Sequence, residues 1–300
     1  MKAMLNNPVF LLLTTGTLVG LYFPLGKVAS EAGISSIAWA MVLSIGACIV
    51  LLPILAYKRS FAIPRGATLR YVAIAGVISF VTPNVLLFSV IPYVGAGYTG
   101  LMFALSPVFT LAVALMFKLK GPNLYGLIGI TLGCIGALII ACARGSIVDA
   151  PPVFWIVAAL FIPVVLASAN VYRTIDWPED GCPDSLAFWS HLFSIAVLFT
   201  LLISIEGTQP IYELYGAAML TITQALLAGL TFPLYFRLQR YGGPVLLSQL
   251  GYVAAAVGML VATIILGERY EFFIWAGSVV IVTGIAATVY SQLSIAKEAK

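Results

Sequence analysis

The chain has 300 residues, of which 62% are hydrophobic and 9% are charged, with a mean hydropathy of +1.08 and a formal net charge of +4. A soluble domain carries about 25% charged residues, so this composition excludes a soluble fold and indicates a multi-pass membrane protein. The small positive charge does not indicate a nucleic-acid partner; its distribution along the chain bears on membrane orientation instead.

Apolar runs recur along the whole chain. A helix needs ~20 mostly apolar residues to cross a bilayer core of ~30 Å, and its backbone groups must be satisfied within the segment. The first run continues past Pro24 without a clear small-residue cleavage site, so we expect a span there rather than a signal peptide. The predicted helical spans are 8–28, 36–57, 71–91, 97–117, 124–142, 153–173, 186–205, 215–237, 244–266 and 272–293.

Basic residues are divided unequally between the two sets of connections. Twelve of the 15 Lys and Arg residues, Arg173 among them, fall on one side, whereas Lys27, Arg144 and Arg269 fall on the other. Connections rich in Lys and Arg face the cytoplasm. Both termini are therefore expected to be cytoplasmic, as an even number of spans also requires, in a multi-pass protein of the cell membrane.

The two halves of the chain match at a shift of about 148 residues. Each half holds five spans, so the second copy would enter the bilayer upside down. We therefore predict an all-α integral membrane protein with ten transmembrane helices in a 5+5 inverted-topology repeat, residues 1–150 and 151–300 together forming one structural unit. Such repeats are typical of secondary transporters, which bind substrate between the copies. The matching residues are Leu86, Phe88, Tyr93, Gly95, Ala114, Gly129 and Gly136 with Leu234, Phe236, Tyr241, Gly243, Ala262, Gly277 and Gly284.

Polar residues within the spans of the first half are candidates for substrate binding. Lys27 closes span 1 and would attract an anionic carboxylate, or alternatively would extend to the interface. Asn84 follows Pro83, which removes a backbone donor and loosens the preceding turn, so Asn84 is predicted to hydrogen-bond substrate; the alternative is an interhelical bond. Tyr98, near the outer end of span 4, is a candidate whose alternative is the aromatic belt.

The second half offers four further candidates. Asn170 closes span 6, and Gln224 lies near the middle of span 8, where Pro233 predicts a broken helix of the kind found at transporter sites. Gln249 and Tyr252 are three residues apart and share one face of span 9. An amide and a phenol on one face suit an amphipathic solute, and the alternative is packing against a neighbouring helix.

Charged and metal-binding residues are scarce inside the spans. All 11 acidic residues lie in connections or at span ends, so no mid-membrane carboxylate is predicted for proton antiport. The transport mechanisms left open are uniport, exchange, or a weaker coupling to protons through His191. A lone His at a span end is, however, typical of a polar anchor. With one His and no Cys pair or nucleotide motif, no metal or cofactor is expected, and an enzyme is disfavoured because acids and bases do not cluster. The scarcity of buried charge favours a neutral or zwitterionic solute.

Four short motifs accompany this topology. They are Pro24-Leu25-Gly26-Lys27, Leu105-Ser106-Pro107-Val108-Phe109, Asn170-Val171-Tyr172-Arg173 and Leu266-Gly267-Glu268. Their order along ten spans resembles the EamA-type members of the drug/metabolite transporter superfamily, although Ala255 stands in the second copy where the first has Pro107. The resemblance implies an exporter or facilitator of small metabolites, amino acids including aromatic ones first among them. It also implies a cavity lined by spans 1, 3 and 4 and by spans 6, 8 and 9.

The sequence thus predicts a secondary transporter that alternates access to a central cavity, with a small-molecule substrate and the lipid bilayer as its partners. A channel and a non-transporting membrane scaffold are the alternatives. Two GxxxG patterns, Gly16 to Gly20 and Gly129 to Gly133, favour close helix packing. A monomer is the simplest assembly, and these patterns leave a dimer open.

Overall fold

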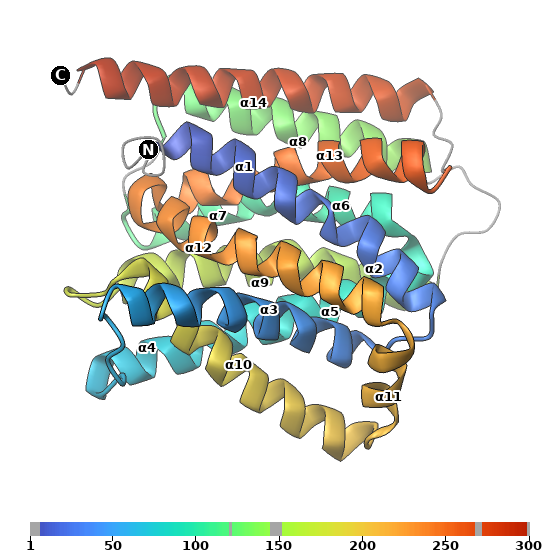
Figure 1. Cartoon of the computed structure of the whole chain (residues 1–300). Coiled ribbons are helices and arrows are strands. Elements are labelled where there is room, and N and C mark those ends of the chain that lie inside the picture. The colour runs from blue at the N-terminus through green and yellow to red at the C-terminus, as the bar shows by residue number, and fades with distance from the viewer. Residues whose placement is uncertain (1–6, 120–121, 145–151, 268–271, 299–300) are drawn as a thin grey trace.

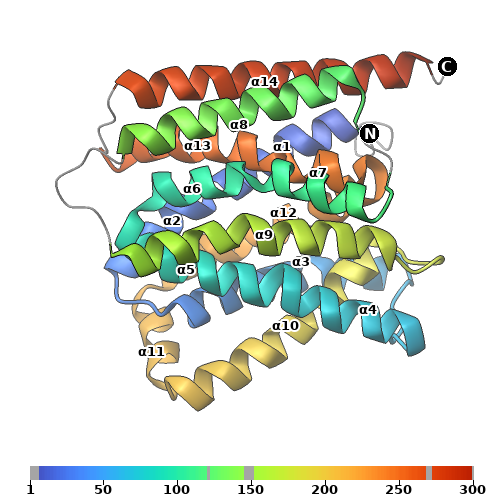
Figure 2. The ribbon, with the colours of Figure 1, turned by 180° about the vertical axis from the view of Figure 1, so that it is seen from behind.

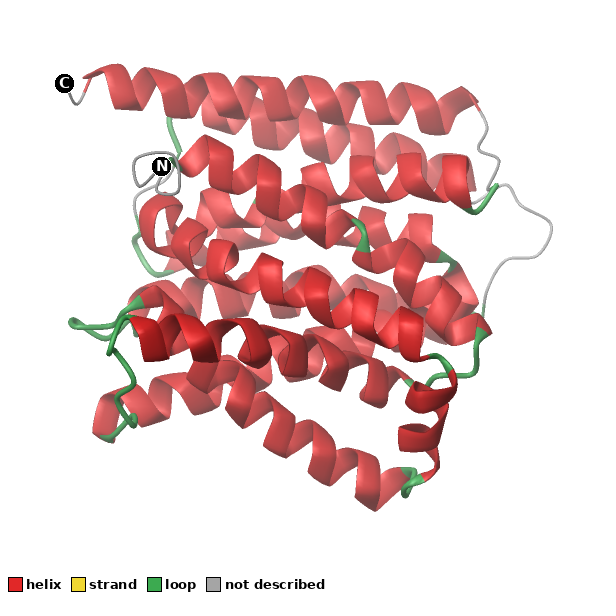
Figure 3. Cartoon of the chain, in the orientation of Figure 1, coloured by secondary structure: helices red, strands yellow, loops and turns green. Residues whose placement is uncertain are grey.

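The computed structural model describes residues 7–119, 122–144, 152–267 and 272–298, and this part of the chain is helical without strands (Figure 3). The helices are α1 (Pro8–Gly20), α2 (Tyr22–Glu31), α3 (Ser36–Tyr57), α4 (Gly66–Gly76), the π-helix η2 (Val77–Val81), α5 (Thr82–Val94), α6 (Ala96–Ala104), α7 (Ser106–Met116), α8 (Leu124–Arg144), α9 (Val153–Ile175), α10 (Pro183–Ile205), α11 (Gln209–Gly216), α12 (Ala218–Ser248), α13 (Leu250–Ile265) and α14 (Phe272–Glu298).

Six helical segments are long and apolar enough to cross a membrane: Pro8–Glu31, Ser36–Tyr57, Gly66–Val94, Val153–Ile175, Pro183–Ile205 and Ala218–Ser248. Four shorter apolar helices, Met102–Met116, Leu124–Gly136, Leu250–Ile265 and Trp275–Ala287, lie on the remaining predicted spans. The long helices form one bundle, and α1 begins at the same end of it at which α14 finishes (Figure 1). We call this the basic end, because Lys58 and Arg65 lie there between α3 and α4, and Arg70 lies early in α4; the other is the opposite end.

Several spans are interrupted where a proline removes a backbone donor. Pro83 follows η2, in which the N–H of Thr82 bonds to the carbonyl of Val77, five residues back. A π turn of this kind widens the helix and is frequent at functional sites. Span 4, predicted as one helix, is divided at Leu105 into α6 and α7, with Pro107 in the first turn of α7. The loosened turn predicted before Pro83 thus takes the form of a π-helix.

Two glycines mark the same backbone turn in the two halves of the chain. Gly95 has φ 83° and ψ 161°, and Gly243 has φ 72° and ψ −178°. Only glycine adopts these angles without strain, and the two positions differ by 148 residues, the shift of the sequence repeat. The prediction of a broken helix at Pro233 is wrong: Pro233 lies in helical backbone, and the non-helical residue of α12 is Gly243. Neighbouring helices allow a proline inside a membrane helix.

Helix contacts made by one half of the chain have counterparts in the other half. α1 packs against α12 and α13, while α9 packs against α5 and α7, and α9 begins at the opposite end and runs back toward the basic end (Figure 2). Between α8 and α14, a Cβ on Gly136 would lie 2.5 Å from the carbonyl oxygen of Gly277, and one on Gly284 would lie 2.7 Å from that of Gly129. Since these glycines are the repeat pairs, each contact is the counterpart of the other, as in an isologous interface.

Candidate functional site

A small cavity of about 40 Å³ lies in the middle of the bundle. Its wall is formed by helices from both halves of the chain, and all six spans that the family resemblance implies contribute to it. The lining residues are Val19, Tyr22, Phe23, Ser79, Phe80, Asn84, Leu87, Phe103, Leu166, Phe232, Tyr235 and Leu250.

Aromatic rings form most of the cavity wall. Phe23 meets Phe103 edge-on with centroids 5.7 Å apart, and Phe80 meets Phe232 edge-on at 5.3 Å. Asn84 supplies a half-buried amide. Apolar walls with a few placed polar groups are typical of small-molecule sites. A volume of 40 Å³ admits water but not a metabolite, so the cavity is contracted in this conformation.

Arg173 lies directly behind this wall with no exposed surface. Its Nη2 donates to Asn170 Oδ1 at 2.8 Å and to Tyr235 Oη at 2.8 Å, and its Nη1 donates to Ser79 Oγ. Nε and Nη2 also donate to Gln239 Oε1 at 3.3 and 3.2 Å. Within the described residues, no carboxylate lies within ion-pair distance of the guanidinium. The side chain is therefore a buried cation held by neutral oxygens.

This burial corrects one prediction from the sequence. Because Arg173 follows the last apolar residues of its span, the sequence predicts it in a cytoplasmic connection. The structure instead places a full positive charge beside the cavity. The sequence does link Arg173 to a candidate site residue, because Asn170 is three residues before Arg173 and therefore lies on the same helix face. The sequence does not show that this face points inward.

His191 is also buried, which corrects its assignment as a polar anchor near the end of a span. Its ring stacks on Phe80 with centroids 4.0 Å apart and lies 4.0 Å from the ring of Phe232. Nδ1 is 3.2 Å from Ser44 Oγ, and Nε2 has no hydrogen-bond partner within the described residues. His191 thus supports the two phenylalanines of the cavity wall from behind.

Ion pairs join the two halves of the chain at the basic end. Asp184 is 2% exposed, and its carboxylate accepts hydrogen bonds from Lys58 Nζ at 2.6 Å and from Arg237 Nη2 at 2.9 Å. The carboxylate of Asp176 forms an ion pair with Arg70 and accepts a hydrogen bond from Tyr172 Oη at 2.7 Å. Lys58 and Arg70 precede residue 150, whereas both carboxylates follow it. These contacts hold α3 and α4 against α9, α10 and α12.

An aromatic layer lies beneath the ion pairs. Tyr71 stacks on Tyr172 at 6.0 Å, Trp177 meets Tyr71 edge-on at 5.9 Å, and Trp177 lies 6.3 Å from Phe236. Arg240 covers the Trp177 ring at 5.4 Å. The ion pairs and this layer separate the central cavity from the basic end.

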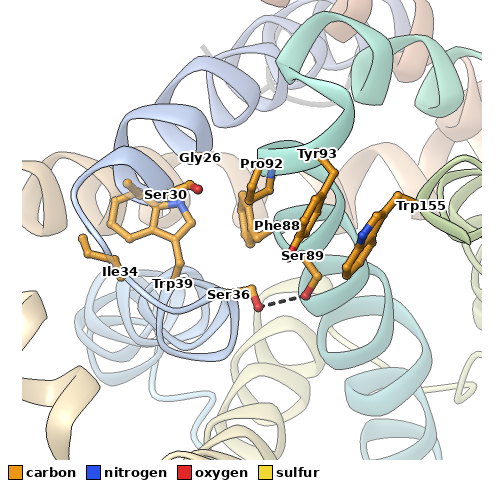
Figure 4. A pocket seen from close by; sticks show the side chains of 11 residues that line it. Gly26, Ser30, Ile34, Ser36, Trp39, Phe88, Ser89, Pro92, Tyr93 and Trp155 are labelled. Atoms are coloured by element: carbon orange, nitrogen blue, oxygen red, sulfur yellow. Dashed lines mark hydrogen bonds between the residues drawn. The ribbon is translucent and has the colours of Figure 1, made fainter. Parts of the chain in front are cut away.

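A larger pocket of about 290 Å³ lies at the opposite end (Figure 4). Trp39 lines one side, and Tyr93 stacks on Trp155 with centroids 3.9 Å apart on the other. Ser89 donates to Ser36 Oγ at 2.8 Å at its floor. Phe88 and Ser89 lie about one helical turn beyond Asn84 along α5, so this pocket continues the line of the central cavity.

The structure separates the other candidate residues. Asn170 belongs to the Arg173 network, whereas Gln224 is buried in α12 and neither of its amide atoms has a partner within the described residues. Lys27 is half-buried on α2 near the opposite end, and the side chain of Tyr98 on α6 lies outside the described residues. Among the described side chains that were predicted to bind substrate, Asn84 alone lines the central cavity.

Gln249 and Tyr252 pack between helices. Gln249 lies at the joint between α12 and α13, buried, and its Oε1 has no hydrogen-bond partner within the described residues. Tyr252 is fully buried, donates to the carbonyl of Ile130 at 3.0 Å, and fills the space beside Gly133. The alternative of helix packing therefore describes Tyr252 better than substrate contact.

The Tyr252→Phe substitution is expected to lower the free energy of unfolding by about 1 kcal/mol, because one buried hydrogen bond is lost while the ring stays in place. The half-saturation concentration for transport is expected to remain unchanged. Thermal denaturation and flux measurements on the same preparation check both values. A rise of tenfold or more in the half-saturation concentration would return Tyr252 to the substrate site.

A helical membrane bundle with an aromatic cavity between its two halves is typical of membrane transporters. The model of the EamA-like transporter family matches residues 6–142 and again residues 153–290. The chain therefore belongs to the EamA-like transporter family. A search of curated proteins found no match. A solved structure titled only "Crystal structure of protein" shares the fold, with a TM-score of 0.69 at 14% identity over 92% of this chain and 97% of the other.

Proposed function

We propose that this chain is a secondary transporter that exports or facilitates small metabolites, amino acids including aromatic ones first among them, by alternating access. Its two five-helix halves, residues 1–150 and 151–300, would form a ten-span inverted repeat and rock about the central cavity. The positive-inside rule assigns the basic end, with both termini, to the cytoplasm. A multi-pass location in a cell membrane of the bacterial inner-membrane type goes with this assignment.

The observation that carries the proposal is the unequal closure of the two ends. Ion pairs and aromatic rings that join the halves cover the cavity on the basic side, whereas a pocket of about 290 Å³ lies on the other side. One closed and one accessible end is what alternating access requires of each state. A channel would need a continuous path, and the contracted cavity does not provide one.

Counterflow in proteoliposomes tests the proposal. Vesicles would be loaded with individual unlabelled amino acids, and the uptake of labelled phenylalanine would be followed. We expect uptake that saturates and that is accelerated by internal substrate. Uptake that rises linearly with concentration and ignores the internal solute would indicate a channel, and the absence of flux with every amino acid would contradict the substrate class.

Asn84→Ala is expected to raise the half-saturation concentration in this assay about 3- to 10-fold, the effect of losing one neutral hydrogen bond to substrate. Gln209→Ala is the matched control, since it removes an exposed amide at the start of α11, away from both pockets. Equal kinetics in the two variants would place Asn84 outside the substrate site.

A further inference from the structure

We infer that Arg173 is the binding group for an anionic carboxylate, and that the transported solute carries one. This assignment rests on the proposed function and narrows its substrate class. It replaces Lys27, which lies near the opposite end, as the carboxylate partner. Its basis is the state of the guanidinium, which carries a full charge in a fully buried position.

A buried cation without a counter-ion is costly, because removal from water is offset only by close pairing and complete hydrogen bonding. The acidic residues nearest along the chain do not supply the pairing. Asp176 is bound by Arg70 and Tyr172, and Asp184 by Lys58 and Arg237. Within the described residues, Arg173 is contacted by neutral oxygens and by the Tyr235 ring, whose centroid lies 5.1 Å from Cζ, so the site has a net positive charge.

The guanidinium also has a donor without a described acceptor. It carries five N–H groups. Nε and Nη2 are directed to Gln239, Asn170 and Tyr235, whereas Nη1 has a single described partner, Ser79 Oγ. One N–H of Nη1 therefore lacks an acceptor within the described residues. Ser79 lines the cavity, and its hydroxyl proton has no described acceptor either.

These two donors suit a singly charged carboxylate. One oxygen would accept from Nη1 and one from the hydroxyl of Ser79, while the rest of the solute would contact Phe80 and Phe232 as the cavity expands. Arg173 bonds to the lining residues Ser79 and Tyr235, and its single charge matches a carboxylate, whereas it would leave one negative charge of a phosphate dianion unpaired. The chemistry therefore favours a monocarboxylate with an apolar or aromatic part.

Ligand-induced thermal stabilisation of the purified protein tests the inference without transport. The probes are sodium 3-phenylpropionate and its uncharged amide, at equal ionic strength. A ligand that binds the folded state raises its stability with concentration, so the carboxylate is expected to raise the melting temperature and the amide is not. Arg173→Gln is expected to weaken carboxylate binding about 10- to 100-fold, as for other charged hydrogen bonds.

Two milder variants cover the case in which Arg173→Gln does not fold. Arg173→Lys keeps the charge but loses the planar fork, and Ser79→Ala removes the second donor; both are expected to weaken carboxylate binding. Arg65→Gln removes an exposed charge at the same end and is expected to bind like the wild type. Equal stabilisation by acid and amide, undiminished binding in the Arg173 variants, or no stabilisation at all would overturn the inference.

Counterflow on the same variants separates this inference from the proposed function. Arg173-dependent carboxylate binding without any flux would support the inference and contradict transport. Saturable phenylalanine exchange that is unaffected in Arg173→Lys and Ser79→Ala would support transport and contradict the inference.

Discussion

Gly46→Ala is expected to prevent accumulation of the folded protein. A Cβ at this position would lie 2.0 Å from the carbonyl oxygen of Ala225 and 2.6 Å from its Cα. These are backbone atoms of α12, so no side chain can move aside, and α3 and α12 would have to separate. Overpacking costs about 1–3 kcal/mol where neighbours can adjust, and we expect the upper end of that range or more because they cannot.

Gly216→Ala is the matched control, since a Cβ there meets nothing within 4 Å. Size-exclusion profiles of the detergent-solubilised proteins, followed by thermal denaturation, measure the difference. Gly229→Ala is expected to resemble Gly46→Ala, because its Cβ would lie 2.8 Å from the carbonyl oxygen of Gly46 in the same interface. A monodisperse Gly46→Ala protein with wild-type stability would show that α3 and α12 are not packed this closely.

Asp184→Asn is expected to open the basic end. Lys58 and Arg237 would then face each other without the carboxylate that both now bind. Removing one partner of a buried ion pair costs about 3–5 kcal/mol. Lys58 is 45% exposed, so water screens part of this effect, and we expect about 1–2 kcal/mol. That energy corresponds to an about 5- to 30-fold larger population open at the basic end.

Thiol labelling checks this population. Leu87→Cys, in a background lacking the native cysteines, places a reporter on the cavity wall. An impermeant maleimide applied from the basic side is expected to label the reporter faster in Asp184→Asn than in the parent. Asp180→Asn removes an exposed carboxylate at the same end and is the control. Equal labelling rates in all three proteins would show that the Asp184 ion pairs do not hold the basic end closed.

Features that depend on local sequence were predictable. The apolar runs mark the helices, and the loosened turn before Pro83 follows from the missing N–H of proline. The repeat spacing placed Gly95 and Gly243 at equivalent positions, where the structure has the same unusual backbone turn. In each case the cause lies within a few residues of the feature itself.

Features that depend on neighbouring helices were not predictable. The structure places Gln249 at the joint between α12 and α13. For Tyr252, spacing along one helix does not reveal that the facing surface is α8 and its glycines rather than a cavity. Arg173 and Lys27 both lie at the end of an apolar run, yet only Arg173 is fully buried. The difference is set by the helices that surround each side chain, which a single sequence does not specify.

The Ser36–Ser89 hydrogen bond at the opposite end has a counterpart at the basic end. A shift of 148 residues converts Ser36 into Asp184 and Ser89 into Arg237, so one position of the repeat carries a neutral pair in one copy and an ion pair in the other. Charge-assisted hydrogen bonds are about twice as strong as neutral ones. In the alternating-access cycle proposed above, two identical copies would leave both orientations equally populated. The ion pair at one of these positions would make the orientations unequal in energy and would favour the state that faces away from the basic end.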